Sequence, residues 1–325
     1  MDAAFREDTE EDSRRWVLGL ERARELAAAC PDTRVISVCD REGDFWDLLA
    51  HAVDDGDALL VRASRSVQQS VRTPDGGKEC LWEHVVARPP VAATELTIPA
   101  AGGPRARKER VARIEIRTAE IELLLPRWDR GAEPRPMFAV SAIETGTADG
   151  DDPLHWLLLT TERPAEGEEA AVHAATVLDW YRRRWTIETW FRTLKTGIRI
   201  KDRRLDSADD LRKCLAFDAV TAVHVADLTV LARERPETPA TEVFPEEDID
   251  LLHTMLESQG HRDVVRMPGG RAPDIRAIVI DLGRLVGSHP TPRQPLPGTK
   301  KVWQGLERMS WAVQVRDALG EKRRE

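Results

Sequence analysis

The chain has 325 residues, of which 41% are hydrophobic and 32% are charged, so it can bury a core in one large domain or in two to three small ones. A net charge of −9 argues against a protein whose whole surface binds nucleic acid, and no apolar run reaches the roughly 18 residues that a membrane-spanning helix needs. The acidic N-terminus lacks the apolar stretch of a signal peptide, and the four cysteines form no CxxC pair, which predicts reduced thiols in the cytosol without a zinc site or a disulfide framework.

The first predicted elements form a βαβ unit. Residues 34–40 (RVISVCD) are a short apolar run that ends in an acid, which is typical of a buried strand. Asp44 is expected to cap a helix that ends at the Asp55-Gly56 pair, and residues 57–64 are expected to form a second strand, parallel to the first. This arrangement would place Asp40 at the carboxyl end of a strand, where open α/β sheets bind their ligands.

Residues 66–152 have a different pattern. Short alternating runs (ATELTIPA, RVARIEIRT, AEIELLLP and MFAVSAIE) are separated by Gly- and Pro-rich stretches, which predicts an antiparallel β-rich insertion. Residues 155–162 (HWLLLTTE) form another apolar strand, which is either the last strand of the insertion or a return to the core.

The rest of the chain is predicted to be mainly helical. A long helix is expected over residues 168–198, broken or bent near its start, and a second over residues 207–233. A Pro- and acid-rich segment follows, and further helices are expected near residues 245–259, 272–286 and 298–318. The resulting division is 1–65 for a partial core, 66–152 for the insertion, 153–232 for the rest of the core, 233–250 for a linker and 251–325 for a C-terminal helical region that is expected to dimerise.

The predicted helix over residues 168–198 carries an unusual charge pattern. Residues 181–213 contain eleven Lys and Arg against five Asp and Glu, and a second basic run spans residues 104–117. At about 100° per residue, four polar side chains fall within a wedge of about 60° on an ideal helix: Tyr181, Arg184, Glu188 and Lys195. A neighbouring apolar stripe is expected to face the core: Trp180, Ile187, Trp190, Phe191, Leu194 and Ile198. The wedge is either an ordinary solvated face or a carboxylate set among cations that would gather phosphates about a metal ion.

These four residues fit the pattern Y-x2-R-x3-E-x6-K, which resembles the signature of bacterial transposases of the insertion-sequence-four group, to which the transposase of transposon five belongs. Three further segments resemble that group in the same order along the chain: VISVCDREGDF, PLHWLLLTTE and LPGTKKVWQGLERM. The resemblance implies an RNase H-like α/β core with an antiparallel β insertion and a C-terminal helical domain. It also implies hydrolysis and strand transfer at transposon ends, with Mg²⁺ or Mn²⁺ held by an Asp-Asp-Glu triad.

Carried over by position, the resemblance makes Asp40 and Glu188 the catalytic, metal-binding carboxylates. Tyr181, Arg184 and Lys195 would hold DNA phosphates. Trp156 would stack on a flipped base, a contact worth about 1–3 kcal/mol per base, and Arg62 would be a further DNA contact. Each residue also has a simpler interpretation: Asp40 as the cap of a turn, Trp156 as a core residue and Arg62 as a surface arginine. Trp185, next to the wedge, is expected to serve packing rather than DNA contact.

One part of the family pattern has no counterpart. None of Asp2, Asp8, Asp12 or Asp32 ends an apolar strand, so the family's first catalytic aspartate is not found, and the first core strands are missing with it. We therefore expect the chain to correspond to the C-terminal part of such a transposase, acting on double-stranded transposon-end DNA as a homodimer in the bacterial cytoplasm, in association with the nucleoid and without a membrane. The alternatives are a non-catalytic DNA-binding or dimerising fragment that inhibits or assists a full-length transposase, and an unrelated α/β hydrolase or structural protein with a chance signature.

Overall fold

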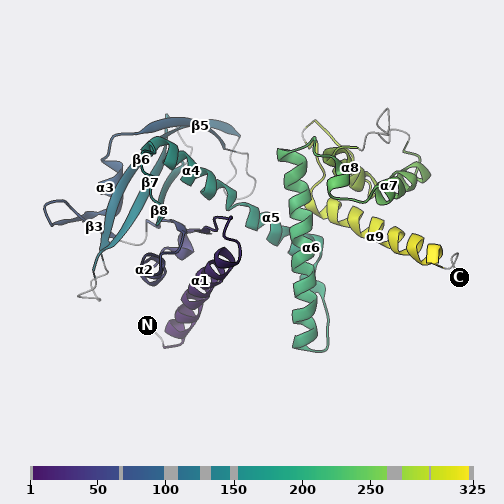
Figure 1. Ribbon diagram of the computed structural model, residues 1–325, viewed down its shortest axis with the longest axis horizontal. Coiled ribbons are helices and arrows are strands. Elements are labelled where there is room, and N and C mark those ends of the chain that lie inside the picture. The colour runs from purple at the N-terminus through teal and green to yellow at the C-terminus, as the bar shows by residue number, and fades with distance from the viewer. Residues whose placement is uncertain are drawn as a thin grey trace. The chain divides into compact units, whose positions relative to one another are not determined.

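The computed structural model describes residues 3–65, 69–98, 109–124, 133–146, 153–261, 273–292 and 294–321. Within these residues the fold is α/β, with a mixed eight-stranded sheet followed by C-terminal helices (Figure 1). The predicted α/β class is confirmed at this level. The chain divides into two compact units, Met1–Arg184 and Trp185–Glu325.

The sheet belongs to the first unit. Its strands lie in the order β1-β2-β8-β7-β6-β3-β4, with β5 paired to β6. Only β1 and β2 are parallel among the described pairs, and the other pairs are antiparallel. The bounds are β1 Ser37–Cys39, β2 Leu59–Arg62, β3 Ser70–Arg72, β4 Lys78–Cys80, β5 Ala92–Ile98, β6 Arg110–Leu124, β7 Arg135–Thr145 and β8 His155–Thr160.

The predicted βαβ unit is confirmed, and the β-rich region joins the same sheet. Strand β8 lies between β2 and β7 and is antiparallel to both, so it connects the βαβ unit with the antiparallel strands. The runs RVARIEIRT and AEIELLLP were expected as separate short strands but form the single strand β6, because no Gly or Pro separates them. Residues 104–108 of the basic run lie outside the described part of the chain.

Alternation along the strands gives the sheet two apolar faces. On one face, Cys39, Val61 and Leu159 belong to a core cluster with residues of α1 (Ala3–Ala29), α2 (Trp46–Asp55) and α3 (Leu81–Val86). On the other face, Val38, Leu60 and Leu158 pack with α4 (Ala170–Arg183). We call these the α2 face and the α4 face of the sheet. Figure 1 shows α4 lying across the strands.

The start of α2 differs from the prediction. Phe45 occupies the N-cap position and gives no side-chain cap, so the expected capping role of Asp44 is wrong. Asp44 is buried and accepts hydrogen bonds from the Ser64 N–H and the Gln69 Nε2, both at 2.6 Å. Asp44 therefore bonds to groups that are distant in the sequence, beside the ends of other strands, instead of capping the helix that follows it.

The long helix predicted over residues 168–198 is broken, but in the middle rather than near its start. Helix α4 ends at Arg183, and α5 (Thr186–Arg192) begins after a turn and continues into a π-helical turn, Thr193–Gly197. At the interruption the backbone bonds shorten to the i−3 type, from Arg184 N to the Tyr181 carbonyl and from Glu188 N to the Trp185 carbonyl. Positions computed on one ideal helix therefore do not hold across the signature, and the boundary between the two units falls here.

The second unit is helical. Its further helices are α6 (Ala208–Glu234), α7 (Glu246–Ser258), α8 (Ile275–Arg284) and α9 (Thr299–Glu321), close to the predicted ranges. They share a core to which α6 gives Val225, α7 Leu252, α8 Ile278 and α9 Val302. The predicted linker at 233–250 holds a 3₁₀ turn (Ala240–Glu242) and the first turn of α7, and the side chain of Ala240 is fully buried, so this segment packs on the core.

Helix α6 is the one described helix that is long and apolar enough to cross a membrane by length and composition. A single such helix is weak evidence, because the core helix of a globular protein passes the same test, and Ala222, Val225 and Ala232 of α6 are buried in the second unit.

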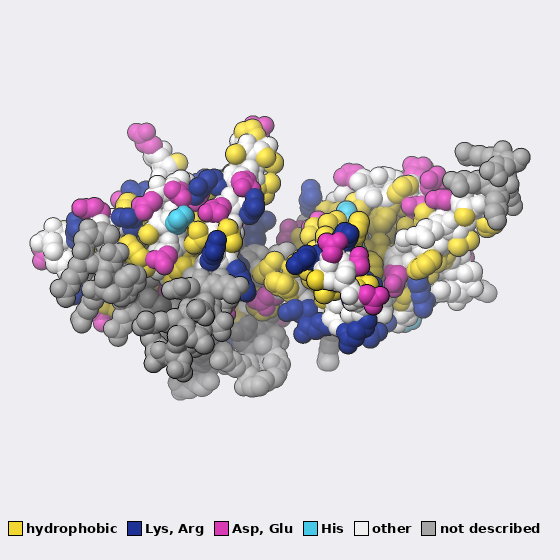
Figure 2. Space-filling model, turned by 90° about the horizontal axis from the view of Figure 1, so that it is seen from below, with side chains coloured by type: hydrophobic (Ala, Val, Ile, Leu, Met, Phe, Trp, Pro, Cys, Tyr) yellow, Lys and Arg dark blue, Asp and Glu magenta, His cyan; other side chains and the backbone are white. Residues whose placement is uncertain are grey.

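The N-terminal end of α6 faces the viewer in Figure 2, where apolar, basic and acidic side chains are mixed. Phe217 and Val220 are the most exposed apolar residues of this helix.

Candidate functional site

Asp40 follows β1 directly, as predicted. Its Oδ1 accepts a hydrogen bond from the Glu42 N–H at 2.9 Å and so begins the 3₁₀ turn Arg41–Gly43. The capping role weighed from the sequence is therefore present. The second oxygen, Oδ2, lies 3.9 Å from the Arg184 Nη1, and the side chain is 41% exposed. One carboxylate oxygen thus serves the turn, and the other faces a cation.

Arg62 ends β2 and lies beside Asp40. The parallel register pairs Cys39 with Val61, so the residues that follow, Asp40 and Arg62, are neighbours at the carboxyl ends of the two strands. Alternation places both on the α4 face. The carboxyl ends of two parallel strands and the start of β8 therefore form one edge, which holds residues that are distant in the sequence.

Tyr181, Arg184 and Trp156 complete this group on the α4 face. The Trp156 and Tyr181 rings meet edge to face at 5.1 Å, and the Arg184 guanidinium carbon lies 5.9 Å from the centre of the Tyr181 ring. Tyr181 is only 5% exposed and belongs to the core cluster, so it packs with the apolar residues rather than lying on a solvated face. Trp156 is partly buried against the same cluster, as its core interpretation expected, and the DNA roles of both remain predictions.

The electrostatic balance of this group is positive. Arg62 and Arg184 bring two guanidinium groups, while Asp40 brings one carboxylate. The Arg184 side chain is 19% exposed, and its ion pair with Asp40 is long, which leaves the attraction between them modest. Fixed guanidinium groups beside an aromatic pair suit a phosphate-bearing ligand.

Glu188 and Lys195 belong to the second unit. Glu188 is half-buried on α5, and the Lys195 Nζ lies 5.0 Å from the centre of the Phe191 ring. The segment is anchored by the Trp190 Nε1, which donates to the Ala219 carbonyl at 3.1 Å, and by the buried Leu194. Neither unit alone contains both predicted carboxylates, Asp40 and Glu188.

Three apolar side chains of this segment are more exposed than the sequence suggested. Ile187 and Phe191 were expected to face the core but are 45% and 43% exposed. Trp185, expected to serve packing, is 57% exposed. The interruption at Arg184 and Trp185 changes which side of the segment faces the core, and Leu194 and Ile198 keep the predicted buried position.

The donor chemistry of Asp40 suits a hard cation, but the number of ligands does not complete a site. Magnesium prefers carboxylate oxygens, and the Asp40 carboxylate is partly exposed. In the part of the chain that the structure describes, no group of three or more His, Cys, Asp or Glu side chains is placed to hold a metal ion. The first unit thus contributes one carboxylate, and a magnesium site would need further oxygens.

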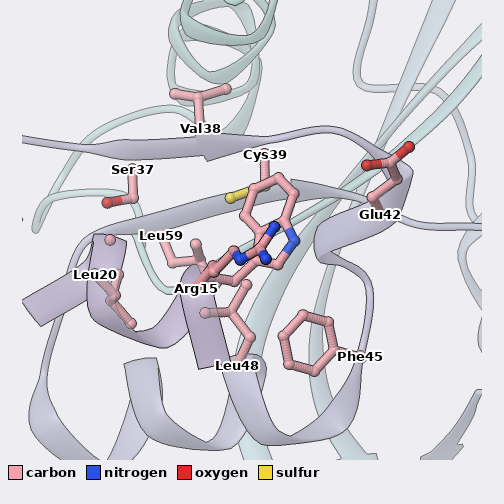
Figure 3. A pocket seen from close by; sticks show the side chains of 11 residues that line it. Arg15, Leu20, Ser37, Val38, Cys39, Glu42, Phe45, Leu48 and Leu59 are labelled. Carbon is pink, nitrogen blue, oxygen red and sulfur yellow. The ribbon is translucent and has the colours of Figure 1, made fainter. Parts of the chain in front are cut away.

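A cavity of about 860 Å³ lies in the first unit on the α2 face, between α1, α2 and β1 (Figure 3). Figure 3 shows the Cys39 side chain on the cavity side of β1 and the Val38 side chain on the opposite side. Burial, together with the neighbouring Asp40 charge, raises the pKa of the Cys39 thiol to about 12. The cavity therefore holds no thiolate at neutral pH and is not the site of a cysteine nucleophile. The sequence did not predict it, because residues of α1 form one of its walls.

No protein-family model matches the chain.

Proposed function

We propose that this chain is part of a DNA transposase of the insertion-sequence-four type, with an RNase H-like core and a site at the carboxyl ends of β1 and β2. The observation that supports this proposal is the meeting of Asp40 and Arg184. These residues come from two separate segments that were matched to the family independently, and their side chains lie 3.9 Å apart. A chance match confined to one helix would not explain why the side chains of Asp40 and Arg184 lie close together.

In this proposal the residues divide the work by their chemistry. Asp40 and Glu188 would bind Mg²⁺ or Mn²⁺, which would activate the attacking group and stabilise the charge that develops at the phosphodiester. Arg62, Arg184 and Lys195 hold the phosphates of double-stranded transposon-end DNA. Trp156 and Tyr181 offer an aromatic surface for an unstacked base. The proposed setting is the bacterial cytoplasm, with a homodimer formed on DNA.

A second candidate function is DNA binding and dimerisation without catalysis. The observation that favours it is the ligand count, because the described residues contain no cluster of three metal-binding side chains. Such a chain would bind the same DNA ends and would assist or inhibit a complete transposase.

Salt-dependent DNA binding tests what the two candidates share. The full chain is titrated by fluorescence anisotropy into double-stranded DNA taken from the ends that flank its gene, at several salt concentrations. The affinity is expected to fall steeply with salt, since each neutralised phosphate contributes a slope of about −0.9 to the log–log plot.

The variant Arg184→Gln is expected to reduce that slope by about one unit and to weaken binding. The matched control is Arg183→Gln at the end of the same helix, because Arg183 is exposed and paired with Asp179 at 2.8 Å. Binding without salt dependence, or equal loss in both variants, would contradict the proposed site.

A nicking assay separates the two candidates. With Mg²⁺ and end DNA, a transposase cuts, and cutting is lost in Asp40→Asn and in Glu188→Gln while DNA binding persists. Binding without any cutting supports the non-catalytic candidate. Cutting that survives in both variants would show that these carboxylates are not the catalytic ones.

A further inference from the structure

A second polar cluster lies on the α2 face of the sheet, opposite the candidate site. The rings of Trp82 and His155 meet edge to face at 4.9 Å. The Arg65 guanidinium carbon lies 5.0 Å from the centre of the Trp82 ring, and the Arg65 Nη2 is hydrogen-bonded to the His155 Nδ1. Helix α3 thus brings Trp82 against β8, and the segment after β2 brings Arg65 against both rings.

Two strand residues extend this cluster into the sheet. Arg117 on β6 stands directly opposite Ser141 on β7. His155 stands opposite Ile143, two residues from Ser141, so His155 and Ser141 are diagonal neighbours on the same face. Ser141 is fully buried, whereas Arg65 is exposed. The cluster therefore has a buried floor and a cationic rim that solvent can reach.

Four buried polar atoms of this cluster have no hydrogen-bond partner within the described residues: Trp82 Nε1, Arg117 Nη1, Ser141 Oγ and His155 Nε2. The other Arg117 nitrogens are used, since Nε donates to the Arg88 carbonyl at 3.0 Å and Nη2 donates to Glu115 at 2.7 Å. Because a guanidinium only donates, the His155 Nδ1 accepts from Arg65, and the proton of the neutral ring lies on Nε2. The unpartnered atoms therefore are three N–H donors and one hydroxyl.

We propose that these four donors, with Arg65 at the rim, form a binding site for one phosphate-type oxyanion. Buried donors without partners cost free energy, and several of them in one place are rare in native proteins. A phosphate-type oxyanion offers mainly acceptor oxygens and matches a set made almost entirely of donors. A water molecule fits such a set less well, because its own two O–H groups would also need acceptors, and few acceptors lie nearby.

The local field also favours an anion. Burial and, after it, the charges of Arg65, Arg117 and Arg62 together lower the pKa of His155 to about 4. The ring is therefore neutral near pH 7 and lies in a positive potential. This site lies on the opposite face from Asp40 and does not depend on the proposed transposase function.

Two sources offer this ligand chemistry, a free phosphate and a phosphate of a DNA strand. The experiment uses the full chain with ¹⁵N-labelled tryptophan and follows the indole N–H signals by NMR. The Trp82 signal is identified by its loss in Trp82→Phe. Sodium phosphate is titrated against sodium chloride at matched ionic strength, and single-stranded oligonucleotides with and without a 5′-phosphate form the other arms.

The expected result is a saturable shift of the Trp82 indole signal with phosphate and none with chloride. Ser141→Ala removes a buried, unpartnered hydroxyl and should fold, yet it should weaken phosphate binding at least about tenfold, as the loss of a hydrogen bond to a charged group does. Trp46→Phe is the matched control, because Trp46 is also a tryptophan of the first unit with an arginine, Arg135, over its ring at 6.0 Å. Its phosphate affinity should stay at the wild-type value.

The arms identify the source. If the shift saturates with phosphate and with the 5′-phosphorylated oligonucleotide but not with the unphosphorylated one, the ligand is a terminal or free phosphate. If it saturates with both oligonucleotides, the ligand is the diester backbone. Absence of a saturable Trp82 shift with every probe would overturn the proposal and leave ordered water as the partner of these donors. If Ser141→Ala binds phosphate with the wild-type affinity, that result would overturn the proposal as well.

Discussion

The two units place their predicted site residues in different ways. In the first unit, Asp40, Arg62, Trp156 and Arg184 come from four separate segments, and the sheet brings them to one edge of the α4 face. In the second unit, Glu188 and Lys195 come from one short segment, α5 with its π-helical turn. The comparison teaches that the register of a sheet makes neighbours of residues that are distant in the sequence, whereas a single helical segment presents only residues that are already close in the sequence.

Each unit has one interior feature that a single substitution can perturb. The α2 face of the first unit carries buried polar groups such as Asp44 and Ser141, and in the second unit, which also buries His253 and Asp281, Gly305 of α9 meets the backbone of Leu282 of α8. Perturbing each feature separately tests whether the units are stabilised independently.

The largest effect is expected for Gly305→Ala. A Cβ at this position would lie 2.2 Å from the Leu282 carbonyl oxygen, so α8 and α9 would have to move apart. We expect a loss of roughly 3 kcal/mol in the free energy of unfolding of the second unit, the upper part of the range for overpacked sites. Hydrogen exchange resolved by segment measures the effect, and the first unit should be unchanged.

Gly320→Ala on the same helix is the control for that variant. Nothing lies within 4 Å of its Cβ position, so alanine should stabilise α9 slightly, by up to about 1 kcal/mol. Equal destabilisation of both units by Gly305→Ala would show that they do not unfold separately.

Asp44→Ala is the corresponding test in the first unit. The change removes the acceptor of the Ser64 N–H and of the Gln69 amide, and we expect a loss of about 2 kcal/mol in the free energy of unfolding. Asp44→Asn keeps an acceptor oxygen and should cost less. Chemical denaturation monitored by circular dichroism makes the comparison, and an equal cost in the two variants would count against the hydrogen-bond explanation.

Asp44 also predicts a pH dependence. Burial raises the pKa of the Asp44 carboxyl in the folded state, and its two hydrogen bonds only partly oppose this. Between the ordinary value of 3.8 and the raised value, the folded chain binds a proton that the unfolded chain has lost. This carboxyl should therefore lower stability as the pH rises through that window, and the contribution should be missing in Asp44→Asn.

A smaller effect is expected for Ser207→Ala at the start of α6. The Ser207 Oγ accepts from the Asp210 N–H at 3.0 Å, a cap worth about 1 kcal/mol. Ser207→Asp should retain most of that stability because aspartate is also a good N-cap. Thermal unfolding distinguishes the two variants, and equal stability would mean that the exposed end of α6 frays in the wild type.

A further expected effect is the acid dependence that His155 confers on the first unit. Its pKa of about 4 lies below the unfolded value of 6.5, so the unfolded chain binds a proton that the folded chain does not. The free energy of unfolding should therefore decrease as the pH is lowered from about 6.5 toward 4. In His155→Gln this part of the slope should vanish, and an identical slope in wild type and variant would place the titration elsewhere.

The sequence by itself determined the βαβ unit, the C-terminal helices and the position of Asp40 after a strand, because apolar periodicity and turn residues act over a few positions. It did not determine the interruption between α4 and α5, the burial of Tyr181 or the tertiary partners of Asp44, since each depends on what packs against it.

The tertiary structure alone decided that Asp40 and Arg184 meet and that four donors without a partner among the described residues gather around Trp82 and His155. The physical reason is that both groups are assembled across strands and helices whose pairing spans long stretches of chain. Local pattern predicts the elements, but only the register of the sheet and the packing of its two faces decide which side chains become neighbours.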